Sequence, residues 1–201
     1  VVSLQGRREL LGDLIANNSF REAYEIWRGM GQSDDRLTAI HDGDFEASTA
    51  LDDSGFGWRF AQGSQGARIS LDDNQPQTGR QSLVVTFMGY SDPNSAVLSQ
   101  LLLVEPRKRY RVKFGARMEN IVTGGLPLIS INDAKVKTKV LAQSTPMGSE
   151  GTAWQLMSFD FQTDQGVEAV ELRLQRKPCI SVPCPIFGSL WLDGFSIEEL
   201  K

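Results

Sequence analysis

Two cysteines close together are the most reactive side chains in this chain of 201 residues. Cys179 and Cys184 lie in the segment Lys-Pro-Cys-Ile-Ser-Val-Pro-Cys-Pro, and His41 is the only histidine. These residues are too few for a structural zinc site, and the spacing differs from that of a Cys-x-x-Cys redox pair. We therefore expect a disulfide that closes a proline-rich loop, which would indicate an oxidising compartment. The alternative is two free cysteines in a cytosolic loop.

The other polar residues form no recognisable catalytic pattern. A single histidine removes most triad and metal-hydrolase schemes. A glycosidase needs only two carboxylates, but no acid stands in an apolar setting that would raise its pKa. The sequence also lacks a glycine-rich phosphate loop between a strand and a helix. We predict that the protein is not an enzyme.

A basic stretch runs from Arg107 to Lys113 and alternates along a predicted strand. It suggests an acidic polysaccharide as ligand, but such a row is also typical of the solvated face of a sandwich. The net charge of −4 argues against a nucleic-acid partner, because general nucleic-acid binders are usually basic. No run of apolar residues is long enough to span a membrane.

The first 35 residues are predicted to form a helical hairpin. Two apolar stripes with helical spacing surround a turn at Asn17 and Asn18; they contain Leu10, Leu11, Leu14 and Ile15, and then Phe20, Ala23, Tyr24, Trp27 and Met30. Residues 10–27 resemble part of a tetratricopeptide helix pair, which suggests the end of a helical-repeat region. The alternative is a helical arm packed on the rest of the chain.

Residues 36–201 are predicted to form a second domain, an antiparallel jelly-roll β-sandwich. Alternation is clearest where Tyr110, Val112 and Phe114 are separated by charged residues. Turn signals separate the predicted strands, and no helical pattern intervenes. The expected strands are residues 38–41, 58–60, 68–71, 83–87, 97–104, 110–116, 128–131, 153–161, 168–175 and 187–200. Trp154 and Trp191 are expected to be packing residues.

Four segments of this domain resemble carbohydrate-binding modules of the family 4 and 9 type, within the galactose-binding-like jelly rolls. These are Ile40–Glu46, Gly55–Arg59, Thr78–Leu83 and Trp191–Ile197, in the family's order. They span about 160 residues. The sequence departs from the family pattern at Asp42 and Gly194, and in the loop rich in proline and cysteine before the last strand.

The resemblance implies a structural calcium ion where the opening and closing segments meet. Calcium prefers carboxylate and carbonyl oxygens. Matched by motif, its ligands would be the side chains of Glu46 and Asp193, the carbonyl of Asp44, and Gln77 and Arg80. The alternative is that Glu46 and Asp193 cap turns or pair with Arg80.

The resemblance also implies a sugar-binding surface on an outward face of the sandwich. Sugars are held by aromatic rings and by planar polar side chains. The candidate residues are Trp58, Tyr90, Gln100, Arg109, Arg111, Gln155 and Arg173. The alternative is that the arginines simply form the solvated side of the sandwich.

The function that follows is a non-catalytic carbohydrate-binding module for a glycan or cell-surface polysaccharide. The alternative is a structural domain that ends a helical-repeat scaffold, contacts a protein partner through the helical segment and binds no sugar. The chain begins at Val1 and not at methionine, so we expect it to be processed or trimmed, and the removal of an upstream targeting signal is one way in which this arises. The predicted location is extracytoplasmic, either periplasmic or secreted.

Overall fold

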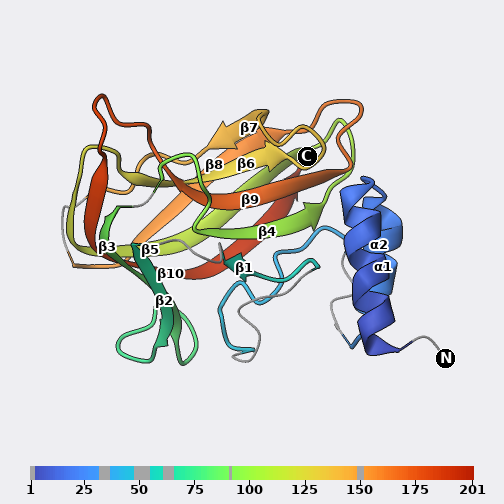
Figure 1. The fold of residues 1–201 in the computed structure, drawn as a ribbon, viewed down its shortest axis with the longest axis horizontal. Coiled ribbons are helices and arrows are strands. Elements are labelled where there is room, and N and C mark those ends of the chain that lie inside the picture. The colour runs from blue at the N-terminus through green and yellow to red at the C-terminus, as the bar shows by residue number, and fades with distance from the viewer. Residues whose placement is uncertain (1–2, 32–36, 48–54, 61–65, 91, 149–151) are drawn as a thin grey trace.

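The fold is an antiparallel β-sandwich with two helices at its N-terminus (Figure 1). The computed structural model describes residues 3–31, 37–47, 55–60, 66–90, 92–148 and 152–201. Two five-stranded sheets face each other, and every strand pairing is antiparallel. This confirms the predicted fold class.

Each sheet combines strands that are far apart in the sequence. Sheet A has the order β1 (Arg59–Phe60), β4 (Leu98–Leu103), β9 (Ala169–Arg176), β6 (Pro127–Asp133) and β7 (Val140–Gln143). Sheet B has the order β2 (Ala67–Asp72), β3 (Ser82–Tyr90), β10 (Pro185–Leu200), β5 (Arg109–Thr123) and β8 (Gln155–Gln162).

The core lies between the sheets and is filled by alternate side chains of both. Tyr110, Val112 and Phe114 point inward from β5, and Leu172 and Leu174 point inward from β9. Burial of such apolar surface contributes roughly 25 cal/mol per Å² to folding. The period-2 pattern of the sequence therefore places one row of each strand in the core and the other row outside.

The helical hairpin is confirmed, and it packs on sheet A. Helices α1 (Leu4–Ala16) and α2 (Phe20–Arg28) bury a second apolar cluster of Leu11, Phe20, Ala23, Tyr24, Trp27, Phe56, Leu101, Leu103, Ala134 and Ala169. Leu101 and Leu103 belong to β4, so this strand is buried on both faces, as its continuous apolar run predicts. The hairpin lies against one end of the outer face of sheet A (Figure 1).

Two details of the strand prediction were wrong. Residues 38–41 form no strand, because the chain turns directly after them and the backbone of His41 pairs with the side chain of Gln100 instead of a strand. Strand β7 was not expected, since its apolar run is only four residues long. The proposed domain boundary between residues 35 and 36 lies outside the described residues. Within the described residues, no helix is long and apolar enough to cross a membrane.

Candidate functional site

The outer face of sheet A carries a polar row that crosses all five strands. Strand register places its members opposite one another, so their side chains share one face. In order from β1 to β7 they are Arg59, Ser99, Arg173, Ser130 and Gln143. The next row contains Leu101, Glu171 and Asn132, and Leu101 lies under the hairpin. We call this outer face of sheet A the sheet A face; Arg59, Ser99, Arg173 and Gln143 are its exposed or partly exposed members.

Two arginines share one carboxylate on the sheet A face. Arg59 Nη2 donates to Glu171 Oε1 at 3.1 Å, and Arg173 Nε lies 3.8 Å from Glu171 Oε2. The Nε atoms of Arg59 and Arg173 are buried and have no hydrogen-bond partner. Unpaired buried donors are uncommon in native proteins and call for an explanation. Two arginines around one glutamate leave the cluster with one net positive charge, and the side chains of Arg59 and Arg173 are 29% and 20% exposed.

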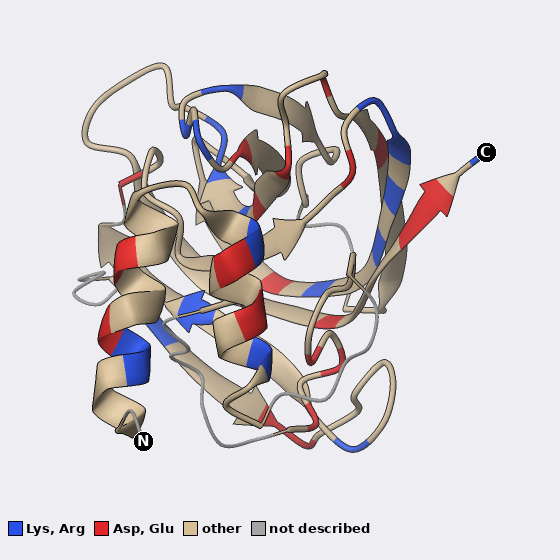
Figure 2. Ribbon diagram, turned by 90° about the vertical axis from the view of Figure 1, so that its right-hand side faces the viewer, with Lys and Arg blue, Asp and Glu red and all other residues tan. Residues whose placement is uncertain are grey.

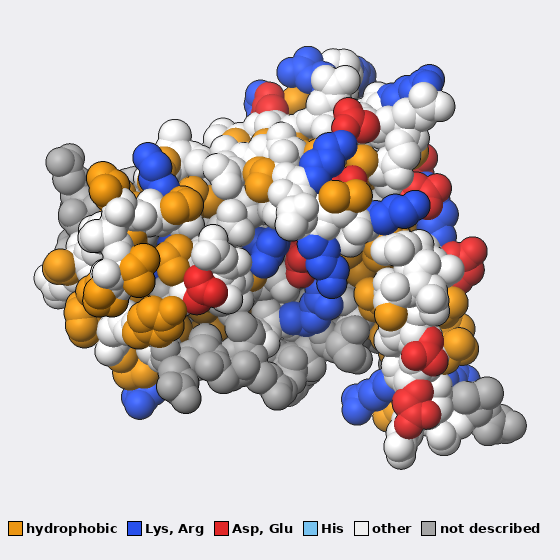
Figure 3. Space-filling model, turned by 45° about the horizontal axis from the view of Figure 1, so that its top comes forward, with side chains coloured by type: hydrophobic (Ala, Val, Ile, Leu, Met, Phe, Trp, Pro, Cys, Tyr) orange, Lys and Arg blue, Asp and Glu red, His pale blue; other side chains and the backbone are white. Residues whose placement is uncertain are grey.

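The floor beside these arginines is polar but internally satisfied. Ser130 Oγ donates to Asn132 Oδ1 at 2.9 Å, and Asn132 Nδ2 donates to the carbonyl of Lys137 at 2.9 Å. Both side chains are buried. Figure 3 shows basic side chains gathered on this side of the molecule next to the helices. The polar groups of this face that a hydroxyl-rich ligand can reach are therefore those of Arg59, Ser99, Arg173 and Gln143.

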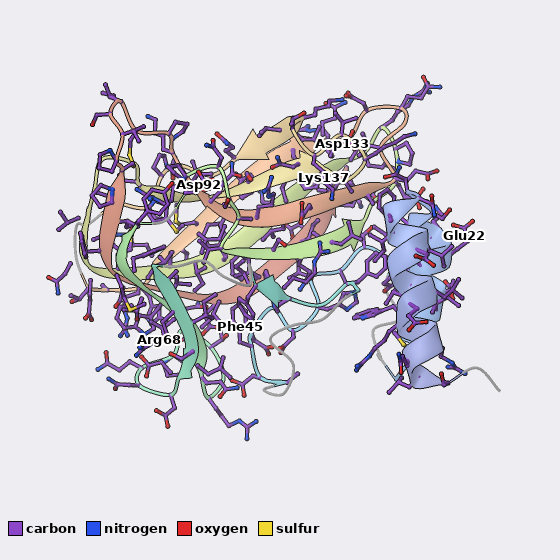
Figure 4. The ribbon with its side chains drawn as sticks, in the orientation of Figure 1. Glu22, Phe45, Arg68, Asp92, Asp133 and Lys137 are labelled. Carbon is purple, nitrogen blue, oxygen red and sulfur yellow. A yellow bond between two sulfur atoms is a disulfide. The ribbon has the colours of Figure 1, made fainter. Side chains whose placement is uncertain are left out.

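A pocket of about 320 Å³ opens at the part of the sheet A face farther along β9 and β6. Its walls are side chains of Arg173, Gln175, Leu128 and Asn132 together with the loops around residues 93–94, 137–138 and 176–178. Figure 4 labels Lys137 and Asp92, which belong to two of the bordering loops. The volume falls in the ordinary range of small-ligand sites.

Of the predicted sugar-binding residues, Arg173 alone lies on the sheet A face. Tyr90, Arg109, Arg111 and Gln155 belong to strands of sheet B, on the other side of the sandwich. Tyr90 is 61% exposed there. Arg111 is bound by two nitrogens to Asp160, at 2.7 and 2.9 Å, which holds the pKa of the Asp160 carboxyl below its usual value. The candidates therefore do not form one surface.

Trp58 and Gln100 are buried and cannot contribute to an open surface as they are placed. Trp58 stacks on Phe45 and donates from Nε1 to the carbonyl of Asp42 at 2.8 Å. Gln100 is fully buried and makes two hydrogen bonds with the backbone of His41, at 2.8 and 2.9 Å. Their side chains hold the opening segment against β4, which is a structural role.

Sequence reasoning missed Arg59, Glu171, Ser99, Ser130 and Gln143 as members of one surface. The alternation of 169–176 would have placed Glu171 beside Arg173 on the outward row. The remaining members become neighbours only through the strand order of sheet A, which no local pattern contains.

Two of the predicted calcium ligands, Glu46 and Asp193, meet around one turn, residues 77–81, which contains Gln77 and Arg80. The carbonyl of Gly43 accepts from Phe195 N at 2.8 Å, so the opening and closing segments are joined. Asp193 Oδ2 accepts from Gln77 N and Thr78 N, at 2.9 and 2.8 Å. Glu46 accepts from Arg80 Nε at 3.0 Å and from Gln81 N at 3.1 Å.

The donor set around this turn does not fit a cation. Both carboxylates face backbone N–H groups, and Glu46 also faces the guanidinium of Arg80. These contacts hold the pKa of the Glu46 carboxyl below its usual value, with the Arg80 backbone as the main cause. Burial raises the pKa of the Asp193 carboxyl, against the effect of its N–H donors. Asp44 is exposed, and Gln77 lies against Gly194. Calcium at this site stays an untested prediction that this arrangement does not favour.

We expect chelation to leave the fold unchanged. A bound metal stabilises only the state that holds it, and here N–H donors already satisfy the carboxylates. The melting temperature should therefore be equal in calcium-containing buffer and in excess EDTA, measured by circular dichroism. A fall in EDTA that added calcium reverses would contradict this and restore the metal.

Cys179 and Cys184 form a disulfide, as predicted, in the loop before β10. The buried guanidinium of Arg176 lies beneath this loop. It donates to the carbonyls of Gly125 and Cys184, at 3.1 and 3.0 Å, and to Thr123 Oγ1 at 2.7 Å. Burial lowers the pKa of Arg176, but an arginine keeps its charge at neutral pH. The loop is therefore fixed to the sandwich next to the pocket.

Trp154 and Trp191 do pack, but on the outer face of sheet B and not in the core. The guanidinium of Arg117 lies 4.2 Å from the ring centre of Trp191 and 5.6 Å from that of Trp154. Trp191 Nε1 donates to Asp72 Oδ2 at 2.6 Å. In this cation–π cluster, the two tryptophan rings contact Arg117 of the same face, so they act as packing residues.

The described part of the chain offers no recognisable catalytic centre. No group of three His, Cys, Asp or Glu side chains is placed there to hold a metal. The His41 ring lies edge-on to Trp27, with ring centres 4.6 Å apart. His41 is therefore part of the packing between the hairpin and the sandwich.

The sequence matches no known protein-family profile and no curated protein. Solved carbohydrate-binding modules match the fold. The module described as "CBM4 structure and function" has a TM-score of 0.57 and 13% identity, over 80% of this chain and 99% of that one. The CBM22-1 xylan-binding domain of Paenibacillus barcinonensis Xyn10C gives 0.51 and 16%, over 85% and 98%. TmCBM61, solved with β-1,4-galactotriose, gives 0.51 and 12%, over 82% and 100%. At these identities the likeness shows the shared jelly-roll fold of carbohydrate-binding modules, as the sequence resemblance implies.

Proposed function

We propose that this chain is a non-catalytic carbohydrate-binding domain whose ligand lies on the sheet A face. The observation that carries the proposal is the polar row Arg59, Ser99, Arg173, Ser130 and Gln143, in which two partly exposed arginines share one carboxylate. The proposal is supported by the fold that this chain shares with a xylan-binding domain and with TmCBM61, which was solved with β-1,4-galactotriose.

An extracytoplasmic location belongs to the same proposal. The disulfide between Cys179 and Cys184 suits an oxidising compartment. Periplasmic or secreted proteins also meet polysaccharides directly. Detection of the disulfide in protein isolated from its native host, with thiols trapped during lysis, would test this part.

A binding test should use a matched pair of tryptophan substitutions. Ser99 lies on the floor of the sheet A face, and Ser158 is exposed on the outer face of sheet B, opposite Lys113. On a glycan array, we expect the wild type and Ser158→Trp to retain the same glycans. Ser99→Trp should lower the affinity at least about tenfold, because the indole would occupy the space that the glycan needs above the polar row.

Three outcomes would count against the proposal. No retention of any glycan by the wild type would remove carbohydrate binding. Loss of binding in Ser158→Trp, with Ser99→Trp unaffected, would move the site to sheet B. Binding by both variants at the affinity of the wild type would exclude the sheet A face as the binding site.

The second candidate function is a protein-interaction domain at the end of a helical-repeat scaffold. It is favoured by two exposed leucines on α1, Leu4 and Leu10, which are 57% and 44% exposed. The tetratricopeptide resemblance of the hairpin stays a prediction. A scaffold terminus would show no glycan binding by the wild type, so the same array separates the two functions.

A further inference from the structure

The pocket on the sheet A face has an unusual set of charges. Four cationic side chains line it, namely Lys137, Arg173, Arg176 and Lys177, and no carboxylate is among its lining residues. No aromatic ring lines it either. Pockets for neutral sugars commonly offer an aromatic ring to the apolar face of the sugar. This pocket offers positive charge in its place.

The two lysines of the pocket are available to a ligand. Both are exposed, and neither has an ion-pair partner among the described residues. Arg173 lies 3.8 Å from Glu171, but Glu171 is shared with Arg59. Asp92, in the bordering loop, accepts from Asn94 and Ser95 instead. Asp92 also interacts electrostatically with the buried Arg176, so the charge open to a ligand lies mainly on Lys137 and Lys177.

The basic stretch at residues 107–113, which leads into β5, behaves differently, although the sequence draws more attention to it. Lys108 pairs with Glu199 at 2.6 Å, Arg111 with Asp160 at 2.7 Å, and Lys113 with Glu198 at 2.7 Å. Figure 2 shows the basic bands of β5 next to the acidic end of β10. Three cations of this stretch are thus neutralised by their own partners, whereas Lys137 and Lys177 have no ion-pair partner among the described residues.

We propose that this pocket takes an acidic sugar residue, whose anionic group is a carboxylate or a sulfate ester. This inference rests on the proposed glycan-binding function and names the ligand class of the same face. Arg173 would hold the anion through its guanidinium, and Lys137 and Lys177 would approach it as point charges. The buried charge of Arg176 lies behind the pocket and attracts the same group. The rest of the glycan would then extend along this face toward Ser99.

The test compares polymers that differ only in their charge. Polygalacturonate, alginate and hyaluronate are run in affinity gels beside their carboxyl-reduced forms, and a sulfated galactan beside its desulfated form. We expect retention by at least one acidic polymer, loss of that retention in its neutral counterpart, and weaker binding as salt is raised. The carboxylate and sulfate arms identify the anion.

The double variant Lys137→Met/Lys177→Met tests the pocket itself. It should weaken binding of the acidic polymer at least about tenfold while keeping the lysine stems' packing. The control is Lys108→Met/Lys113→Met on sheet B, which should bind as the wild type does. If Lys137→Met/Lys177→Met binds the acidic polymer as well as the control and the wild type do, the inference is overturned.

Failure of this inference can be told apart from failure of the proposed function. Equal retention of an acidic polymer and its neutral form would overturn the acidic ligand and leave glycan binding in place. Retention of neutral glycans alone on the array would do the same. Retention of no glycan at all would overturn both.

Discussion

Replacing Arg173 by methionine is expected to weaken binding of the glycan identified on the array at least about tenfold. Arg173 stands at the middle of the polar row, flanked by Ser99 and Ser130. Its side chain is 20% exposed, and its Nε has no hydrogen-bond partner. Methionine keeps the apolar stem but removes every donor. The measurement is isothermal titration calorimetry with the purified domain.

The fold should tolerate this substitution, because Glu171 keeps its contact with Arg59 at 3.1 Å. The matched control is Arg111→Met, which removes an arginine from the outer face of sheet B. We expect Arg111→Met to bind normally. Loss of binding in the control, or full binding by Arg173→Met at an unchanged melting temperature, would contradict the assignment.

Replacing Trp27 by alanine is expected to lower the free energy of unfolding by about 3–5 kcal/mol, as for other buried aromatic residues. Trp27 is 2% exposed and lies between the hairpin and the sandwich. Its ring centre is 5.8 Å from that of Tyr24 and 5.7 Å from that of Phe56. Removal of the indole would leave a cavity between the hairpin and the sandwich that the surrounding side chains cannot fill. Urea unfolding followed by circular dichroism measures it.

Leu10→Ala is the control for this contact, since Leu10 is on the same hairpin but 44% exposed. It should change the unfolding free energy little. A small effect of Trp27→Ala would mean that the hairpin is not an integral part of the fold. That result would favour the helical-repeat reading, in which the hairpin packs on a neighbouring repeat.

Strand alternation made the sandwich predictable. Segments such as 110–116 alternate strictly, and one row of each must enter a core. The apolar spacing of α2 likewise predicted which side of the helix is buried. Strand ends were less predictable: residues 38–41 have strand-like composition, yet side-chain contacts with Gln100 turn the chain there.

The site was less predictable because it depends on strand order. Arg111 and Arg173 both alternate outward on their strands, and the sequence does not say which lies opposite an acid. The pairing of β5 with β8 places Asp160 across from Arg111 and neutralises it. The pairing of β9 with β4 and β6 leaves Arg173 between two serines.

Trp58 shows the same limit for aromatic residues. A tryptophan next to a glycine-rich turn has the composition of a stacking platform. In the structure, the ring is covered by Phe45 and Phe195, with ring centres 5.2 Å away in both cases. Only the meeting of the opening and closing segments, which are far apart in the sequence, reveals this packing.

The most direct test is to locate the ligand by NMR. The tightest glycan from the array is titrated into ¹⁵N-labelled protein, and amide shifts are followed. We predict changes at Ser99, Arg173 and Ser130, with Arg111 and Ser158 unaffected. Shifts confined to sheet B, with the sheet A face silent, would contradict the account.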